Sequence, residues 1–371
     1  MSSTPVPPQG QPSLHAVQVL GSGSSGSGVH VRTLAAGLVA RGLRVTVCAP
    51  HGAEEDYGFT AAGARFVPAD ARTGAGDAAV LRAAAAGADL VHAHGLRSGL
   101  LAALAMRGRG TPLIVTWHTR PHTEGARSHL VRLMERKVAR AATVVLGASS
   151  DLVDLARARG ARDARLAPVA VPAPRHVPER DEEWRQKFRA ELGVMERSLI
   201  LTAGRLEEGR GHGPLLDAAL AWAALDPAPL LVIAGEGPGR PALQRRIDAE
   251  GLAVRLVGRR PDVSDLLAAA DVAVLSSPWE ARSLLAQEAL RVGVPLVATA
   301  VGGVPELVGE AADLVPYGDS QALALAVHRL LTDPGWHAQL AAAGRAQADD
   351  WPGEDDAVSH VLRIYDELAG S

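Results

Sequence analysis

The sequence predicts an α/β protein made of two doubly wound, Rossmann-like domains that face each other across a cleft. Short apolar runs alternate with longer amphipathic stretches along its 371 residues, and a proline-rich stretch interrupts the alternation once. Such alternation is typical of parallel sheets covered by helices. With 47% hydrophobic residues, each half of the chain can bury a core of its own.

Apolar runs predict the strands, and the segments between them, such as 29–40 and 130–141, have helical spacing. The expected strands of the first half are residues 16–20, 45–49, 90–92, 113–117 and 143–146. Those of the second half are residues 199–202, 230–234, 254–257, 272–275 and 296–299. Two consecutive sets of this kind indicate two separate parallel sheets.

The stretch between the two sets, 168–181, contains four prolines and then a run of charges. Proline fixes the backbone and removes a hydrogen-bond donor, so this composition is typical of a linker. We therefore expect a disordered tail over residues 1–12, an N-terminal domain over 13–174 and a C-terminal domain over 175–350. Residues 351–371 have helical spacing, and this last helix can pack back on the N-terminal domain.

Overall charge and composition exclude several classes of protein. A formal net charge of -3 gives no general attraction for nucleic acid, so no nucleic-acid partner is expected. The start of the chain lacks the basic and apolar regions of a signal peptide, and no segment is apolar enough to span a bilayer. The single cysteine, Cys48, lies in an apolar run and is expected to be a buried strand residue. We expect a cytoplasmic, bacterial protein whose closest approach to lipid is peripheral contact at the inner face of the membrane.

A glycine-rich stretch at residues 21–28 follows the first expected strand and precedes a helix. Its glycines, Gly21, Gly23 and Gly26 among them, let backbone amides approach a phosphate or a sugar. A dinucleotide site would also need an acidic residue at the end of the second strand, where the sequence has Cys48, Ala49 and Pro50. The alternative interpretation is a flexible surface turn.

Two arginines, Arg205 and Arg210, follow the first strand of the second domain. In parallel sheets that end of the strand faces the ligand crevice, and paired guanidinium groups suit a diphosphate. The alternative is a solvated loop in which the arginines pair with Glu207 and Glu208.

Two glutamates, Glu280 and Glu288, bracket the expected start of a helix. Glu280 would lie in the loop after a strand, and Glu288 would lie within the helix. The free amides of Leu284 and Leu285 could then face an anion, and the Glu288 carboxylate could accept from two ribose hydroxyls. The alternative for Glu288 is a solvated helical position, which its apolar neighbours disfavour.

Histidines mark the ends of two strands in the first domain. His118 directly follows the apolar run at 113–117. His92 and His94 would share one face of another strand. A metal pair needs a third ligand, which the sequence does not indicate, so we favour a structural role or contact with an acceptor. No metal is expected, and the chain has no Asp-x-Asp motif.

Across nearly its whole length the chain resembles glycosyltransferase family 4, which has the GT-B fold. The order and spacing of the matching segments are those of the family, and the second half is the more specific. The segments are the glycine-rich stretch, Gly204-Arg205-Leu206 with Arg210-Gly211, Ala234-Gly235-Glu236-Gly237-Pro238, the stretch from Glu280 to Leu290, Gly293-Val294-Pro295, and Gly302-Gly303-Val304-Pro305-Glu306.

The resemblance implies a role for each candidate residue. Arg205 and Arg210 would hold the donor diphosphate, Glu288 the ribose, and Glu280 the donor sugar, while His118 would lie near the transferred sugar and the acceptor. Gly258, Arg259, Leu284 and Leu285 would complete the donor site, and Gly21, Gly23, Gly26 and His94 would lie on the acceptor side.

Three positions depart from the family pattern. Arg210 stands where the family usually has lysine, which keeps the charge and changes the geometry. The sequence has Ala281-Arg282-Ser283 where the family often has glycine and phenylalanine, and Arg282 could bear on the choice of sugar. The segment 168–171 replaces a common Asn-Gly pair.

The implied activity is retaining, metal-independent transfer of a hexose-type sugar from a nucleotide-diphosphate donor, without a cofactor. The implied acceptor is a cell-envelope lipid or glycan precursor, or a small polyol such as inositol phosphate. Three alternatives stay open: a nucleotide-sugar epimerase of the same fold, a nicotinamide-dependent oxidoreductase, and a non-catalytic two-lobed sugar-binding protein.

Overall fold

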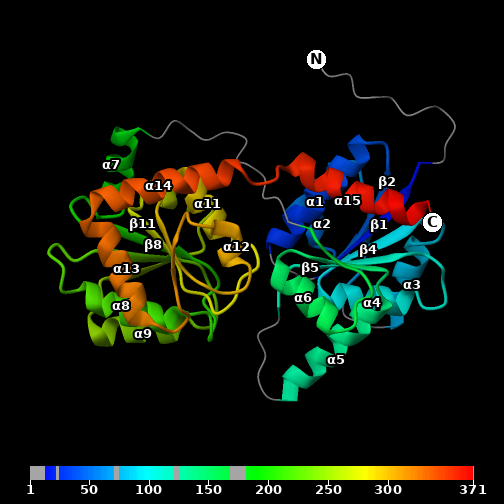
Figure 1. Cartoon of the computed structure of the whole chain (residues 1–371), viewed down its shortest axis with the longest axis horizontal. Helices are drawn as coiled ribbons and strands as arrows, with labels where there is room; N and C mark the ends of the chain where they lie inside the picture. The colour runs from blue at the N-terminus through cyan, green and yellow to red at the C-terminus, as the bar shows by residue number, and fades with distance from the viewer. Residues whose placement is uncertain (1–12, 22–24, 71–74, 121–125, 168–180, 371) are drawn as a thin grey trace. The chain divides into compact units, whose positions relative to one another are not determined.

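The structure is a computed structural model that describes residues 13–21, 25–70, 75–120, 126–167 and 181–370. The expected N-terminal tail, Gly23 and the linker prolines lie outside these residues. The chain forms two compact units (Figure 1): unit 1 comprises Met1–Ala173 with Pro352–Ser371, and unit 2 comprises Pro174–Trp351.

Unit 1 is built on a parallel sheet with the strand order β3-β2-β1-β4-β5-β6-β7. Its central strands are buried along their whole length, which explains their nearly continuous apolar sequences. The strands are β1 (His15–Leu20), β2 (Arg44–Ala49), β3 (Arg65–Pro68), β4 (Leu90–His94), β5 (Leu113–Trp117), β6 (Val144–Gly147) and β7 (Ala164–Leu166).

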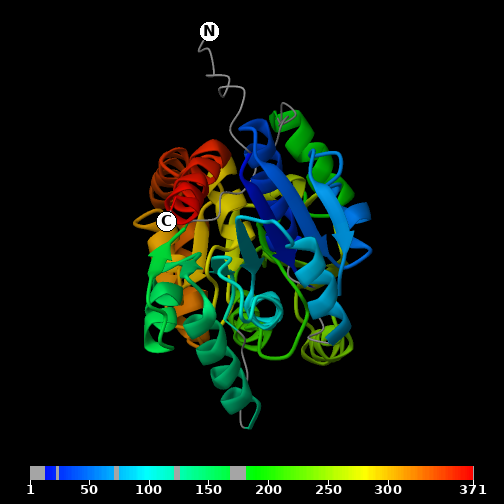
Figure 2. The same cartoon turned by 90° about the vertical axis from the view of Figure 1, so that its right-hand side faces the viewer.

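Helices cover both faces of this sheet (Figure 1). On one face lie α1 (Ser25–Ala40), α2 (Ala53–Tyr57) and α15 (Glu354–Ala369), and on the other lie α3 (Ala75–Ala84), α4 (Leu96–Ala105), α5 (Ala126–Ala141) and α6 (Ser150–Ala158). α5 projects beyond the other helices of unit 1 (Figure 1 and Figure 2), and Leu130 and Leu133 on it are largely exposed.

α15, from the end of the chain, packs against α1 and completes the core of unit 1. Gly37 of α1 permits this close approach, because a Cβ at Gly37 would lie 2.5 Å from Val358 Cγ2. Two ion pairs at the surface, Arg41 with Asp355 and Arg165 with Glu367, flank the contact. Tyr365 is fully buried beneath α15.

Unit 2 has a parallel sheet with the strand order β10-β9-β8-β11-β12-β13. The strands are β8 (Leu199–Ala203), β9 (Leu230–Ala234), β10 (Val254–Gly258), β11 (Val272–Leu275), β12 (Leu296–Thr299) and β13 (Asp313–Val315). The helices are α7 (Glu182–Glu191), α8 (His212–Trp222), α9 (Arg240–Glu250), α10 (Val263–Ala269), α11 (Leu284–Val292), α12 (Val304–Val308), α13 (Ser320–Thr332) and α14 (Pro334–Asp349). Two separate apolar clusters, one on each face of the sheet, form its core.

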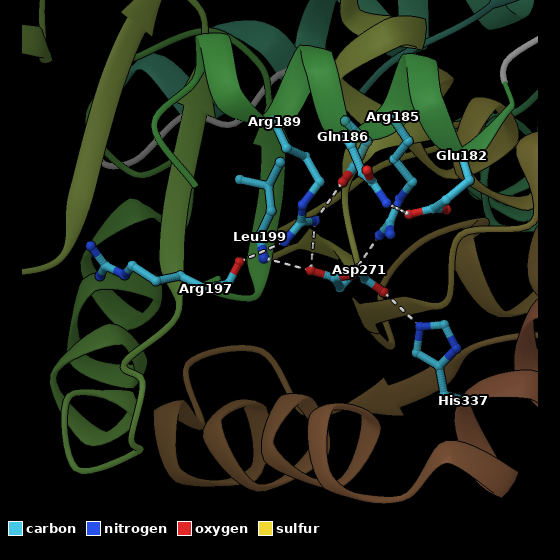
Figure 3. Close-up of polar contacts among 9 residues, drawn as sticks. Glu182, Arg185, Gln186, Arg189, Arg197, Leu199, Asp271 and His337 are labelled. Atoms are coloured by element: carbon cyan, nitrogen blue, oxygen red, sulfur yellow. Dashed lines mark hydrogen bonds and ion pairs between the residues drawn. The ribbon is translucent and has the colours of Figure 1, made fainter. Parts of the chain in front are cut away.

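A charged cluster around Asp271 fastens α7 to the sheet of unit 2 (Figure 3). The Asp271 carboxylate accepts hydrogen bonds from Arg185 at 2.6 Å, from Arg189 at 3.0 Å and from the backbone N of Leu199 at 2.7 Å. His337 of α14 bonds the backbone oxygen of Asp271. Because Leu199 begins β8 and Asp271 directly precedes β11, the cluster lies at the amino edge of the sheet, away from the candidate residues at its carboxyl edge.

The expected fold class is confirmed, and every expected strand is present within one or two residues. Three short strands were missed: β3, β7 and β13, which lie at or next to sheet edges and carry polar residues. Cys48 is fully buried in β2, as expected, and burial raises the pKa of its thiol to about 12.

Candidate active site

Two glycines allow close backbone contacts between the loops at the carboxyl edge of the sheet in unit 2. Gly211 has a φ of +83°, and a Cβ there would lie 1.8 Å from the backbone oxygen of Ser276. Gly235 has a φ of +152°, and its Cβ would lie 1.8 Å from the oxygen of Gly204. Both positions therefore accept only glycine. The loops after β8, β9 and β11 are thereby held against one another, and they carry the candidate residues Arg205, Arg210 and Glu280.

Arg205 and Arg210 lie on the loop after β8, and both contact Glu207. Arg205 Nε donates to Glu207 Oε1 at 2.8 Å, and Arg210 Nε lies 3.7 Å from Oε2. The pairing with Glu207 considered from the sequence is thus present. The Arg205 and Arg210 side chains are 71% and 44% exposed, and such exposed pairs contribute only about 0–1 kcal/mol. An anion that approaches the two arginines can therefore replace Glu207 at little cost.

Glu280 lies in the loop between β11 and α11, as expected, and its backbone is fixed by the loop after β12. Its carbonyl oxygen accepts from the N of Gly303 at 2.8 Å, and a Cβ at Gly302 would lie 2.2 Å from that oxygen. Burial raises the pKa of the Glu280 carboxyl, against a hydrogen bond from Ser277 and the nearby charge of Arg210. Gly211 of the arginine loop contacts Ser276, at the start of the loop that carries Glu280, so the two loops adjoin.

Glu288 lies in the second turn of α11, also as expected. Burial raises the pKa of its carboxyl, and the hydroxyl of Ser264 on α10 lies 3.4 Å from Oε2. Ser283 caps the helix, and its hydroxyl accepts from the N of Ala286 at 3.4 Å. The first residues of the helix are Leu284, half exposed, and Leu285, buried. Their amides are in the first turn, where the helix dipole favours an anion.

Gly258 and Arg259 lie at the end of β10, beside the loop after β9. The oxygen of Gly258 accepts from the N of Gly235 at 2.7 Å, and Gly258 has a φ of +75°. Arg259 is exposed at the same edge of the sheet. The structure thus brings the predicted donor residues to one edge of unit 2, at the ends of β8, β10 and β11.

In unit 1 a polar network crosses the sheet beneath α15. The register pairs Gln18 of β1 with His92 of β4, and His94 of β4 with Thr116 of β5. Tyr365 of α15 joins this network, because its hydroxyl accepts from Gln18 Nε2 at 2.6 Å and lies 2.7 Å from His92 Nδ1. Such a network across buried strands is fully hydrogen-bonded, which offsets the cost of burying its polar groups.

His118 stands at the end of this network, directly after β5. Its Nε2 lies 3.1 Å from His94 Nδ1, and the two rings are stacked with centroids 5.4 Å apart. His30 of α1 packs edge-on against both rings. Burial lowers the pKa of His118 and His94 well below the ordinary value, and it lowers the pKa of His30 to about 4. These imidazoles are therefore neutral at neutral pH.

The sequence indicates His92, His94 and His118 as candidates, but not Gln18, His30 or the role of Tyr365. Gln18 lies within an apolar strand, and Tyr365 lies among the apolar residues of the last helix, so neither position has a local signal for a polar contact. Of the glycine-rich stretch, the structure describes Gly21, which follows β1, and Gly26, which lies in α1. In the part of the chain that the structure describes, no three side chains form a metal-binding group, and no helix is long and apolar enough to cross a membrane.

The two units match two family models. Residues 184–347 match the model of glycosyl transferases group 1, and residues 25–172 match the glycosyl transferase 4-like domain. The D-inositol 3-phosphate glycosyltransferase of Xylanimonas cellulosilytica is 31% identical over 301 residues, which cover 75% of this chain and 71% of the relative. The chain belongs to glycosyltransferase family 4.

Other glycosyltransferases match over similar lengths. The 2-deoxystreptamine N-acetyl-D-glucosaminyltransferase of Streptomyces fradiae is 33% identical over 69% of this chain and 65% of its own length. The alignments with curated relatives span between 64% and 73% of those proteins. The solved structure of Anabaena Alr3699/HepE in complex with UDP has a TM-score of 0.79 at 21% identity, and the match covers 96% of this chain and 100% of that chain. The chain thus has the two-domain GT-B fold, and family membership makes it a hexosyltransferase.

Proposed function

We propose that the chain transfers a hexose-type sugar from a nucleotide-diphosphate donor to an acceptor hydroxyl, with retention of the anomeric configuration and without a metal ion. Unit 2 binds the donor, and unit 1 supplies the residues on the acceptor side. The observation that carries the proposal is the convergence of Arg205, Arg210 and Glu280 on adjoining loops at the ends of β8 and β11.

The division of labour follows from the charges of these groups. The two guanidinium groups and the first amides of α11 stabilise the negative charge that grows on the leaving diphosphate. That stabilisation is the role a divalent metal fills in other transferases. The Glu288 carboxylate accepts from the ribose hydroxyls, and Glu280, held by Gly303, contacts the donor sugar.

The proposed reaction takes place on one face of the sugar. The bond from the anomeric carbon to the diphosphate breaks, and a bond to the acceptor oxygen forms on the same face. The hydroxyl proton passes to the departing diphosphate, so the step needs no protein nucleophile. His118 lies on the acceptor side and accepts a hydrogen bond from a substrate hydroxyl.

Cyclic polyols are the first acceptors to test. One relative is named for D-inositol 3-phosphate and another for 2-deoxystreptamine, and both compounds are cyclitols with several hydroxyl groups. Glycan and lipid precursors of the cell envelope are the next class. The relative bound to UDP makes uridine donors the first donors to test.

The test is a panel of nucleotide-diphosphate hexoses with each acceptor in excess chelator, with products analysed by NMR. We expect release of the nucleotide diphosphate only when acceptor is present, and a product with the anomeric configuration of the donor. Turnover that is lost in chelator and restored by manganese or magnesium would refute metal independence. Conversion of the donor without any acceptor would instead identify an epimerase.

Glu280→Gln and Glu288→Gln should separate kinetically. A ribose contact exists in the free nucleotide diphosphate and in the whole donor, so Glu288→Gln should weaken both by a similar factor, about tenfold for a charge-assisted hydrogen bond. A sugar contact is absent from the free nucleotide, so Glu280→Gln should lower kcat and leave nucleotide affinity nearly unchanged. Calorimetry with the free nucleotide, beside steady-state rates, measures both. Equal weakening of nucleotide binding by the two variants would contradict the assigned roles.

A further inference from the structure

Basic residues are concentrated between residues 90 and 150, although the chain as a whole has a formal net charge of -3. This stretch has eight arginines and one lysine against two acidic residues, so its charge is opposite in sign to that of the whole chain. One acid, Glu135, is buried in α5 and pairs with Arg159 at 2.6 Å, and the other, Glu124, lies outside the described residues. A local excess of positive charge attracts anionic partners.

The exposed side of α5 combines such cations with leucines. Leu130 and Leu133 are one helical turn apart, and their side chains are 60% and 51% exposed. Positions three, four and seven residues after Leu133 lie on the same side of the helix, and all three are exposed cations. We call this set the α5 face; its cations are Arg132, Arg136, Lys137 and Arg140. Among the described residues, none of these cations has a carboxylate partner.

The C-terminal half of α5 attaches the helix to the rest of unit 1. Val138 packs against α4 so closely that a Cβ at Gly99 would lie 2.9 Å from Val138 Cγ1. Val138 and its neighbour Ala139 are buried, whereas no residue from 128 to 134 is buried. α5 projects beyond the other helices of unit 1 (Figure 1 and Figure 2), and both leucines of the α5 face lie on its less covered half.

The chemistry of the α5 face fits one kind of partner better than others. A single exposed leucine is ordinary on a protein surface, so the combination with unpaired cations is the informative feature. Anionic lipid matches both parts, because its headgroups attract the cations and the adjoining acyl region accepts the leucines. A second copy of the chain would bring like charges together, and a nucleic acid would leave the leucines in water.

We propose that the α5 face docks unit 1 on an anionic lipid bilayer. Leu130 and Leu133 enter the boundary between headgroups and acyl chains, and the four cations of the face lie over the negative headgroups. This docking is a property of the surface of unit 1, and it does not depend on the proposed function.

Sedimentation of the full chain with lipid vesicles tests the docking. One set of vesicles contains phosphatidylcholine alone, and the other contains equal amounts of phosphatidylcholine and phosphatidylglycerol. We expect binding to the mixed, anionic vesicles and much weaker binding to the neutral ones. Binding should also weaken between about 0.1 M and about 1 M salt, because the Debye length falls from about 10 Å to about 3 Å.

Two double variants separate the contributions of charge and of apolar contact. Arg136→Gln with Lys137→Gln should lower the partition coefficient about twenty-fivefold, because each cation near an anionic surface contributes a factor of about five. Leu130→Ser with Leu133→Ser should lower it about tenfold, because two partly inserted leucines are lost. All four side chains are exposed, so both variants should fold, and their thermal unfolding checks this.

The matched control is Leu220→Ser with Leu325→Ser on α8 and α13 of unit 2. These leucines are 52% and 62% exposed, much like the pair on the α5 face, and no effect on vesicle binding is expected. An equal loss of binding in this control would overturn the proposal.

Three further results would also overturn the docking. The first is absence of binding to the anionic vesicles at low salt. The second is undiminished binding of the folded leucine variant, which would leave attraction between charges alone, as for an acidic protein or a nucleic acid. The third is self-association of the chain in sedimentation velocity that the leucine variant abolishes, without vesicle binding, which would assign the α5 face to a second copy.

Discussion

Arg210→Ala should lower kcat/KM for the sugar donor about tenfold to a hundredfold, because a hydrogen bond to a charged group contributes about 1.5–3 kcal/mol. Arg205→Ala should have an effect of the same size, since both guanidinium groups lie on the loop after β8 and contact Glu207. The loss should appear mainly in kcat, because the charge on the leaving diphosphate increases in the transition state. Steady-state rates with a defined donor measure it.

Three matched variants make this prediction specific. Arg210→Lys supplies the charge that the family usually has at this position and should retain most of the activity. Glu207→Gln removes the anion that competes with the diphosphate and should strengthen nucleotide binding slightly. Arg246→Ala, which removes an arginine paired with Asp217 and Glu250, should leave the rate unchanged. Activity that survives alanine at both Arg205 and Arg210 would show that the donor is held elsewhere.

Unit 1 should lose about 4 kcal/mol of unfolding free energy between pH 7 and pH 5 from His30 and His92 alone. Burial lowers their folded-state pKa values to about 4 and about 3, whereas an unfolded histidine titrates near 6.5. Between these values the unfolded state binds the extra protons. Stability is therefore full above about pH 6.5 and falls as the pH decreases toward the folded-state values, by about 2 kcal/mol for each histidine at pH 5.

Hydrogen exchange measured by mass spectrometry can follow the two units separately, after correction for the pH dependence of intrinsic exchange. Peptides from β4 should lose protection on acidification more than peptides from β11 in unit 2. His30→Leu should reduce the loss in unit 1 by about 2 kcal/mol, because one titrating group is removed. Protection of β4 that does not depend on pH between 7 and 5 would contradict the prediction.

The sequence predicts the elements of this fold well because both sheets are parallel and buried on both faces. Their strands are therefore continuous apolar runs, and glycine and proline separate them from amphipathic helices. The short strands β3, β7 and β13 lack this signal, since edge positions tolerate polar residues such as Arg65 and Asp313. Their existence depends on the neighbouring strand and not on local sequence.

The candidate donor residues were also accessible to sequence reasoning, because the ends of parallel strands meet at one edge. Glu280 and Glu288 are in the loop and helix that their spacing predicts. Contacts between segments that are distant in the sequence could not be predicted in this way. Gly303 holds the backbone of Glu280, and Tyr365 bonds Gln18, and neither pairing has a local pattern that would reveal it.

Unit 1 is assembled from segments on both sides of unit 2 in the sequence, which affects the order in which the two units fold during synthesis. When the ribosome has completed residues 1–173, α1 and β4 still lack their contacts with α15, including those of the fully buried Tyr365. The intervening unit 2 is continuous in sequence and can fold as it emerges. The part of unit 1 that is synthesised before unit 2 is therefore completed only after unit 2, and it keeps an unsealed apolar face and an open histidine network until α15 has been synthesised.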